Sequence, residues 1–174
     1  HETTAPAVFA ARAAIGNDIP LMVDMNCPMD GESATAFAHA CRAAAPMFLE
    51  EPVWPPEDFA TLAEVRSKGG LDIAAGENAC TVHQFRQMMT AGAVSFAQPS
   101  VTKVGGITEY LKVVALADEL GLRLAPHSPY FGPGLLATRS AMILQPEVTA
   151  ESPTDPFISS RSQRKTAGPW RRAE

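Results

Sequence analysis

Apolar residues along the chain form short continuous runs, separated by longer segments in which apolar positions recur every three or four residues. Such runs are typical of parallel strands buried on both faces, and the periodic segments predict amphipathic helices. The alternation predicts an α/β fold with a parallel sheet. The predicted strands are residues 19–26, 46–51, 71–78, 93–100 and 122–128, and the predicted helices are residues 5–14, 33–45, 57–68, 82–90 and 106–120.

Polar residues end the predicted strands at nearly regular intervals. Asp24, Glu50 and Glu77 lie 26 and 27 residues apart. Ser100 follows 23 residues later, and His127 follows after another 27. This regular unit, with a polar residue at each strand end, favours a (β/α) barrel of the TIM type over a doubly wound sheet. A complete barrel needs about 250 residues, so we expect the 174 residues to form a partial barrel of about five to six βα units.

The C-terminal end differs in composition from the rest. Residues 152–174 include few apolar side chains but five Lys or Arg. We therefore predict a barrel domain over residues 1–151, with a weak sixth strand near residues 148–151, and a flexible basic tail over residues 152–174. The chain begins with His rather than Met, so we expect it to be an N-terminally truncated piece of a longer protein.

Composition argues against several classes of partner. With 14 basic and 19 acidic residues the formal net charge is −5, which disfavours nucleic acid or an anionic membrane as the main partner. No apolar run approaches the length of a membrane-spanning helix. Cys27, Cys41 and Cys80 lack the spacing of metal ligands and predict reduced thiols in a cytoplasmic protein.

Three carboxylates are the strongest functional candidates. Asp24, Glu50 and Glu77 each end an apolar strand, where an uncompensated charge is costly to bury. The strands of a barrel open on one rim, so we expect these side chains to converge there. A single such residue is more simply explained as a helix cap, but three on consecutive strands favour a metal site. Three hard oxygen ligands suit Mg²⁺.

His127 is the candidate catalytic residue. It ends the last predicted strand, in LAPHSPYFGPG, and so lies at the rim where barrel active sites are built. We expect the Pro- and Gly-rich segment after it to form a loop that shapes a pocket. His39 and His83 lie within predicted helices, and His1 is terminal, so we assign them no catalytic role.

The motifs VDMN, LEEP, AGEN, QPSVTKVGGITE and PHS occur in this order, each at a strand end. Together they resemble the mandelate racemase-like branch of the enolase superfamily, over about residues 2–144. The resemblance implies that the three carboxylates hold Mg²⁺ and that Asn26 faces the substrate. It also implies that His127 is an acid/base on the seventh strand of the family barrel.

The reaction implied by this resemblance is removal of the proton next to a carboxylate, with the metal stabilising the ene-diolate that forms. Such an enzyme acts as a racemase, epimerase or dehydratase on a 2-hydroxy acid or acid sugar. The implied partner is a small carboxylate substrate, and the intact family enzyme is expected to be a homo-oligomer.

The sequence departs from the family pattern at several positions. The family's Lys-x-Lys pair on the second barrel strand and its N-terminal capping domain are not found in it. Ser100 stands where racemase-type members often have Asp, so we expect a less basic His127 than in an Asp–His dyad. We expect Lys103 to form an ion pair with the carboxylates. Glu51 is expected to lie behind Glu50 or in an ion pair, because neighbouring strand residues point to opposite faces.

Two alternatives remain open. The chain could be a catalytically incompetent fragment that retains only the metal-ligand half of the site. It could also be a barrel enzyme of another type, such as a metal-dependent aldolase. The absence of the Lys-x-Lys pair supports the first alternative, because such a fragment lacks its base. The ordered set of motifs argues against the second.

Overall fold

The structure, a computed structural model, describes residues 4–129 and 131–143. Its centre is a sheet of five parallel strands, hydrogen-bonded to one another in sequence order. The strands are shorter than predicted at both ends; Asp24 and Glu50 are the last residues of their strands, whereas Glu77, Ser100 and His127 lie in the loops that follow. The five strands are β1 (Met22–Asp24), β2 (Phe48–Glu50), β3 (Ile73–Ala75), β4 (Phe96–Ala97) and β5 (Arg123–Leu124).

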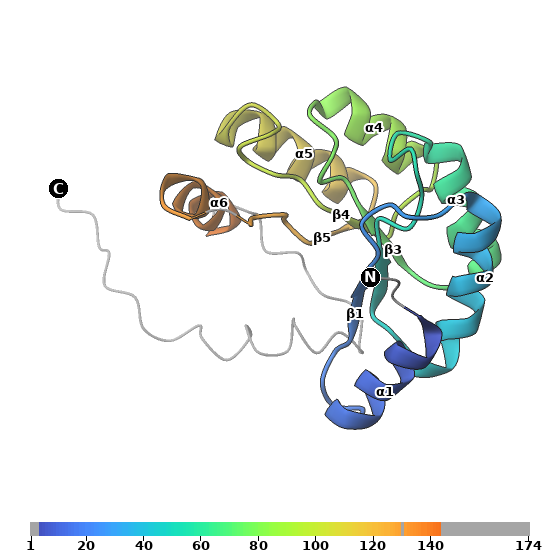
Figure 1. Cartoon of the computed structure of the whole chain (residues 1–174). Coiled ribbons are helices and arrows are strands. Elements are labelled where there is room, and N and C mark those ends of the chain that lie inside the picture. Colours follow the sequence, from blue (N-terminus) through green and yellow to red (C-terminus); the bar gives the residue numbers. More distant parts are fainter. Residues whose placement is uncertain (1–3, 130, 144–174) are drawn as a thin grey trace, which may run out of the picture.

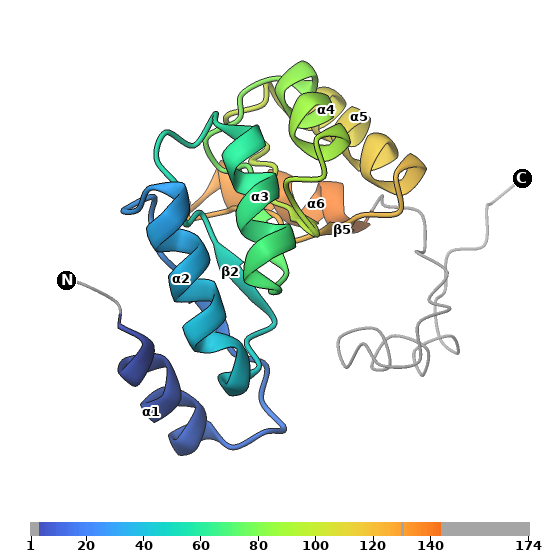
Figure 2. The same cartoon turned by 90° about the vertical axis from the view of Figure 1, so that its right-hand side faces the viewer.

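Helices alternate with the strands. They are α1 (Ala5–Ile15), α2 (Gly31–Cys41), α3 (Phe59–Gly69), α4 (Val82–Thr90), α5 (Ile107–Glu119) and α6 (Pro133–Ile143), with a short 3-10 helix, η1 (Arg42–Ala44), after α2. Figures 1 and 2 show α1 to α5 in chain order along one side of the curved sheet. A doubly wound sheet reverses its strand order and carries helices on both faces. The unreversed order therefore confirms the predicted α/β fold, a partial (β/α) barrel.

Two apolar clusters cover the two faces of the sheet. The larger lies between the sheet and the helices and includes Leu49 and Ile73. The smaller contains Phe48, Ala74 and Phe96, which lie on the other face because neighbouring strand residues point to opposite sides. The rings of Phe48 and Phe96 have centroids 5.0 Å apart. β2, β3 and β4 are thus buried on both faces, as predicted.

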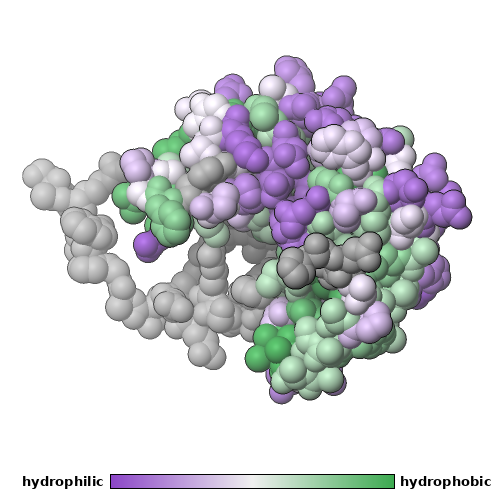
Figure 3. All heavy atoms as spheres, viewed as in Figure 1, coloured by the Kyte–Doolittle hydropathy of each residue, from purple (hydrophilic) through white to green (hydrophobic). Residues whose placement is uncertain are grey.

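The two outer strands differ from that prediction. Met22 of β1 is 47% exposed, and Ile19 in the preceding loop is 54% exposed. Arg123 of β5 is also exposed. An edge strand has a neighbouring strand on one side only, so the prediction of burial on both faces is wrong for β1 and β5. Figure 3 shows hydrophobic residues gathered over the α1 end of the molecule.

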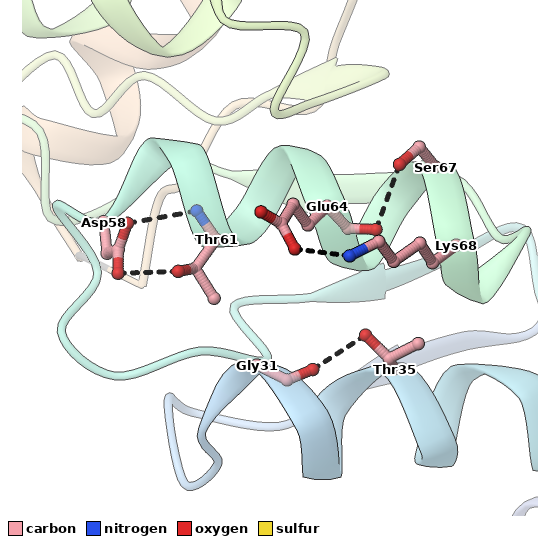
Figure 4. Close-up of polar contacts among 7 residues, drawn as sticks. All are labelled: Gly31, Thr35, Asp58, Thr61, Glu64, Ser67 and Lys68. Atoms are coloured by element: carbon pink, nitrogen blue, oxygen red, sulfur yellow. Dashed lines mark hydrogen bonds and ion pairs between the residues drawn. The ribbon is translucent and has the colours of Figure 1, made fainter.

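Side-chain caps define where α2, α3 and α4 begin. Asp58 precedes α3 and accepts hydrogen bonds from the Thr61 backbone N (3.0 Å) and the Thr61 hydroxyl (2.7 Å), as Figure 4 shows. Asp30 precedes α2 and accepts a hydrogen bond from the Ser33 backbone N at 2.8 Å. Asp is a favoured residue at this position because it satisfies backbone N–H groups that have no partner within the helix.

α6 was not predicted, because its start lies in the Pro- and Gly-rich segment interpreted as a loop. Pro133 occupies the first position of the helix, where its missing N–H costs nothing and its fixed φ fits. Thr138 and Ala141 are buried, and α6 packs against α5. The weak strand predicted at residues 148–151 and the tail at 152–174 lie outside the described residues.

None of the helices in the described part of the chain is long and apolar enough to cross a membrane. Cys27, Cys41 and Cys80 are free thiols, as predicted. Burial raises the pKa of the Cys41 thiol, so it stays protonated at neutral pH.

Candidate active site

The predicted site residues lie at one edge of the sheet. Asp24 and Glu50 are direct neighbours, because each ends its strand and the register of β1 and β2 pairs them. Glu77 comes two residues after the end of β3, and His127 comes three residues after the end of β5. The carboxyl ends of parallel strands in a barrel open on one side. The four residues therefore share one rim.

The pKa of Glu50 depends on burial and on the charges of the neighbouring rim residues. Burial is the main cause that raises the pKa of its carboxyl above the ordinary value of 4.5, and a hydrogen bond from the side chain of Gln98 acts in the opposite direction. The negative charges of Asp24 and Glu77 raise the pKa of Glu50 further. These carboxylates are thus close enough to repel one another. Gln98, a buried residue beyond β4, was not predicted as a site residue.

The carboxylate oxygens of the three predicted metal ligands do not form a preformed metal site. Within residues 4–129 and 131–143, no three His, Cys, Asp or Glu side chains are grouped closely enough to hold a metal ion. Oε2 of Glu77 instead lies 3.0 Å from Nε2 of His127. An imidazole N–H is a better partner for a carboxylate than other carboxylates are. The structure therefore brings the predicted ligands to one rim but pairs Glu77 with the histidine.

Burial and nearby charges act on the imidazole of His127. Burial is the main cause that lowers the pKa of His127 below 6.5; the charge of Glu77 raises this pKa, and the charge of Lys103 lowers it. Ser100 is fully buried, with its hydroxyl 3.2 Å from that of Thr102. The carboxylate beside the imidazole ring is therefore Glu77, from β3 rather than from the end of β4.

Asn26 and Lys103 both lie near the rim. The backbone N of Asn26 donates a hydrogen bond to Oδ1 of Asp24 at 3.0 Å, so the turn after β1 orients this carboxylate. None of the ion pairs among the described residues includes Lys103, so its predicted pairing with the carboxylates is not formed there. Its charge acts on His127 instead.

Glu51 and Cys27 are closely associated. Glu51 is 3% exposed, and its Oε1 accepts a hydrogen bond from the Gly76 backbone N at 2.8 Å. Its Oε2 accepts one from Sγ of Cys27 at 3.4 Å. Burial, followed by the charge of Glu51, raises the pKa of Cys27 to about 12, so Cys27 remains a thiol that can donate. The sequence analysis treated Cys27 only as a reduced cysteine; its place after a strand end was the one available signal.

Backbone strain marks the same rim. Asn26, Cys27 and Glu51 have φ values of 55°, 56° and 42°. Non-glycine residues seldom adopt such values, which cost about 1–3 kcal/mol each and concentrate at functional sites. All three follow the ends of β1 and β2. The left-handed backbone directs side chains where a straight strand would not.

Comparison with known proteins identifies the family. A family model described as "Enolase C-terminal domain-like" matches residues 1–169. The chain is 35% identical over 130 residues to the D-galactonate dehydratase of Ralstonia nicotianae, a match that covers 75% of this chain and 34% of that protein. The chain thus spans about a third of the length of this curated relative.

Two solved structures share the fold. One is a racemase from Streptomyces coelicolor with bound magnesium, at a TM-score of 0.69 and 33% identity, covering 72% of this chain and 37% of that one. The other is an L-talarate dehydratase from Polaromonas complexed with Mg and L-glucarate, at a TM-score of 0.70 and 30% identity. This match covers 78% of this chain and 35% of that one. With the family model matching nearly the whole sequence, the chain belongs to the enolase C-terminal domain-like family.

Proposed function

We propose that this chain carries the metal-binding and acid–base part of an Mg²⁺-dependent enzyme that removes the proton next to a carboxylate. The proposed substrate is a 2-hydroxy acid or an acid sugar, and the outcome is racemisation, epimerisation or dehydration. Relatives named as a dehydratase and as a racemase with bound magnesium support this class of reaction. The observation that carries the proposal is the position of Asp24, Glu50 and Glu77 at the ends of three adjacent strands.

The donor set fits Mg²⁺. Carboxylate oxygens are ligands that this ion prefers, and its remaining positions take water or substrate oxygens. The raised pKa of Glu50 reflects burial and neighbouring negative charges, both of which a bound dication offsets. We assign Asp24, Glu50 and Glu77 as the residues that would hold the ion. A bound dication would supply electrostatic stabilisation for the negative charge that develops on the substrate carboxylate when the neighbouring proton is removed.

His127 is the proposed acid–base residue. Because burial keeps the pKa of His127 below 6.5, its imidazole is neutral at neutral pH and can accept a proton. Nε2 lies 3.0 Å from Glu77, so a substrate that uses this nitrogen must compete with the carboxylate. Asn26, exposed beside Asp24, is proposed to contact the substrate.

A second candidate is a catalytically incompetent piece that keeps only the metal-ligand half of the site. One observation favours it. The Lys-x-Lys pair implied by the resemblance is not in this sequence. The family match argues against the aldolase alternative, and the homo-oligomeric state of the whole enzyme remains a proposal.

A metal titration tests the ligand assignment that both candidates share. The 174-residue chain is titrated with Mn²⁺, a paramagnetic substitute for Mg²⁺, and binding is followed by water-proton relaxation. We expect binding that is lost in Glu50→Gln and retained in Glu64→Gln. Glu64 is a matched control because it is an exposed Glu on α3, paired with Lys68 on the surface. Binding that does not depend on Glu50 contradicts both candidates.

Isotope exchange then separates the two candidates. The α-protons of a panel of 2-hydroxy acids and acid sugars are followed by NMR in D₂O with Mg²⁺ and the purified chain. Exchange that disappears in His127→Asn supports the enzyme. Metal binding without any exchange supports the incompetent piece, because the ligands are then present without a working base.

A further inference from the structure

We infer that Glu51 is a positioning residue that fixes the backbone next to Glu77 relative to the end of β1, and so sets the geometry of the proposed metal ligands. The inference rests on the proposed function, since it concerns how those ligands are arranged. The Glu51 side chain is 3% exposed. A carboxylate with so little access to water must find its hydrogen-bond donors within the protein.

Hydrogen bonds connect Glu51 to both neighbouring strands. Toward β3, its backbone N donates to the carbonyl of Ala74 (3.0 Å), and its Oε1 accepts from the backbone N of Gly76 (2.8 Å). Toward β1, its carbonyl accepts from the backbone N of Cys27 (2.6 Å), and its Oε2 accepts from Sγ of Cys27 (3.4 Å). A single residue thus links the ends of three strands through both its main chain and its side chain.

These partners lie next to the proposed ligands. Gly76 directly precedes Glu77, and Cys27 comes three residues after Asp24. Gly76 has a φ of 127°, a conformation that ordinary residues avoid. Local backbone preference therefore does little to hold this turn, and a buried hydrogen bond from a neighbouring strand has more influence on where Glu77 is directed.

Two substitutions separate a positioning role from a simple effect of charge. Asp keeps the charge of Glu51 but shortens the side chain by one C–C bond, about 1.5 Å, so its oxygen no longer reaches the Gly76 N–H. Gln keeps the length and the acceptor oxygen for Gly76 but removes the charge. Positioning therefore predicts that Glu51→Asp is the damaging change, whereas an effect of charge predicts that Glu51→Gln is.

Mn²⁺ binding by the full 174-residue chain measures this difference. We expect Glu51→Asp to weaken binding about tenfold, as is common when a group that orients a metal ligand is altered. Glu51→Gln is expected to bind more nearly like wild type, and Glu64→Gln is the exposed control. The reverse order of the two Glu51 variants overturns the inference.

Amide hydrogen exchange in the metal-free chain gives a readout that does not require the proposed function. We expect faster exchange at Gly76 in Glu51→Asp, with unchanged exchange at Leu49, whose N–H donates to the backbone carbonyl of Asp72 at 2.9 Å. Unchanged exchange at Gly76 overturns the inference. If the wild-type chain binds no Mn²⁺, the proposed function fails, and this exchange experiment still decides the role of Glu51.

A second variant covers the case in which Glu51→Asp does not fold, shown by lost protection at Leu49. Cys27→Ala removes the thiol donor to Oε2 but leaves the acceptor for Gly76 in place. We then expect Oε2 to be released and the exchange at Gly76 to rise by less than the full loss of the bond would cause. Exchange at Gly76 equal to wild type in Cys27→Ala overturns the inference.

Discussion

Gly76 is a position where one added methyl group is expected to be costly. A Cβ atom there would lie 2.7 Å from Cε1 of Phe85 and 3.2 Å from the backbone N of Gln98. Its φ of 127° costs an ordinary residue about 1–3 kcal/mol, and overpacking a core adds about 1–3 kcal/mol. We predict that Gly76→Ala lowers the free energy of unfolding by about 2–6 kcal/mol. This is a large part of the about 5–15 kcal/mol of a typical domain.

Urea denaturation followed by circular dichroism measures this loss, provided that the slope m stays at its wild-type value. Gly92→Ala is the matched control. Gly92 has a φ of 71°, but no heavy atom lies within 4 Å of its Cβ position, so backbone strain of about 1–2 kcal/mol is the whole expected cost. If Gly76→Ala costs no more than Gly92→Ala, the close approach of α4 and of the loop after β4 to Gly76 is refuted.

Three further predictions concern other parts of the molecule. Asp58→Ala removes the cap of α3 and should cost about 1 kcal/mol in urea denaturation at neutral pH. Hydrogen bonds lower the pKa of Asp58 below 3.8, so this cost should shrink as pH falls through that lowered pKa; a cost independent of pH contradicts the cap. Arg66→Ala removes the donor to Oγ of Ser95 at 2.8 Å and should lower the free energy of unfolding by about 2 kcal/mol. An unchanged free energy of unfolding means that this hydrogen bond is absent in solution. Ser100→Asp should raise the pKa of His127 in an NMR titration, and an unchanged titration means that position 100 does not act on the ring.

Local sequence patterns determined the order of the elements and the common rim. Apolar runs and amphipathic segments report which face of each element is buried, and that information is contained in a few neighbouring residues. Because the ends of consecutive parallel strands open on one side, the spacing of Asp24, Glu50 and Glu77 was enough to predict that they share an edge. Local patterns also have a limit: Pro133 was interpreted as part of a loop, although Pro is compatible with the first turn of a helix.

Only the tertiary structure decided which side chains meet across the rim. Glu77 pairs with His127 at 3.0 Å, and Glu51 lies buried between Cys27 and Gly76. These contacts join segments far apart in the chain and depend on left-handed turns after the strands, which no periodicity encodes. Burial, which shifts the pKa of His127, likewise exists only once sheet and helices are assembled. A pattern of residues specifies the direction in which a strand ends, whereas the distance between side chains on different strands depends on the packing of the whole.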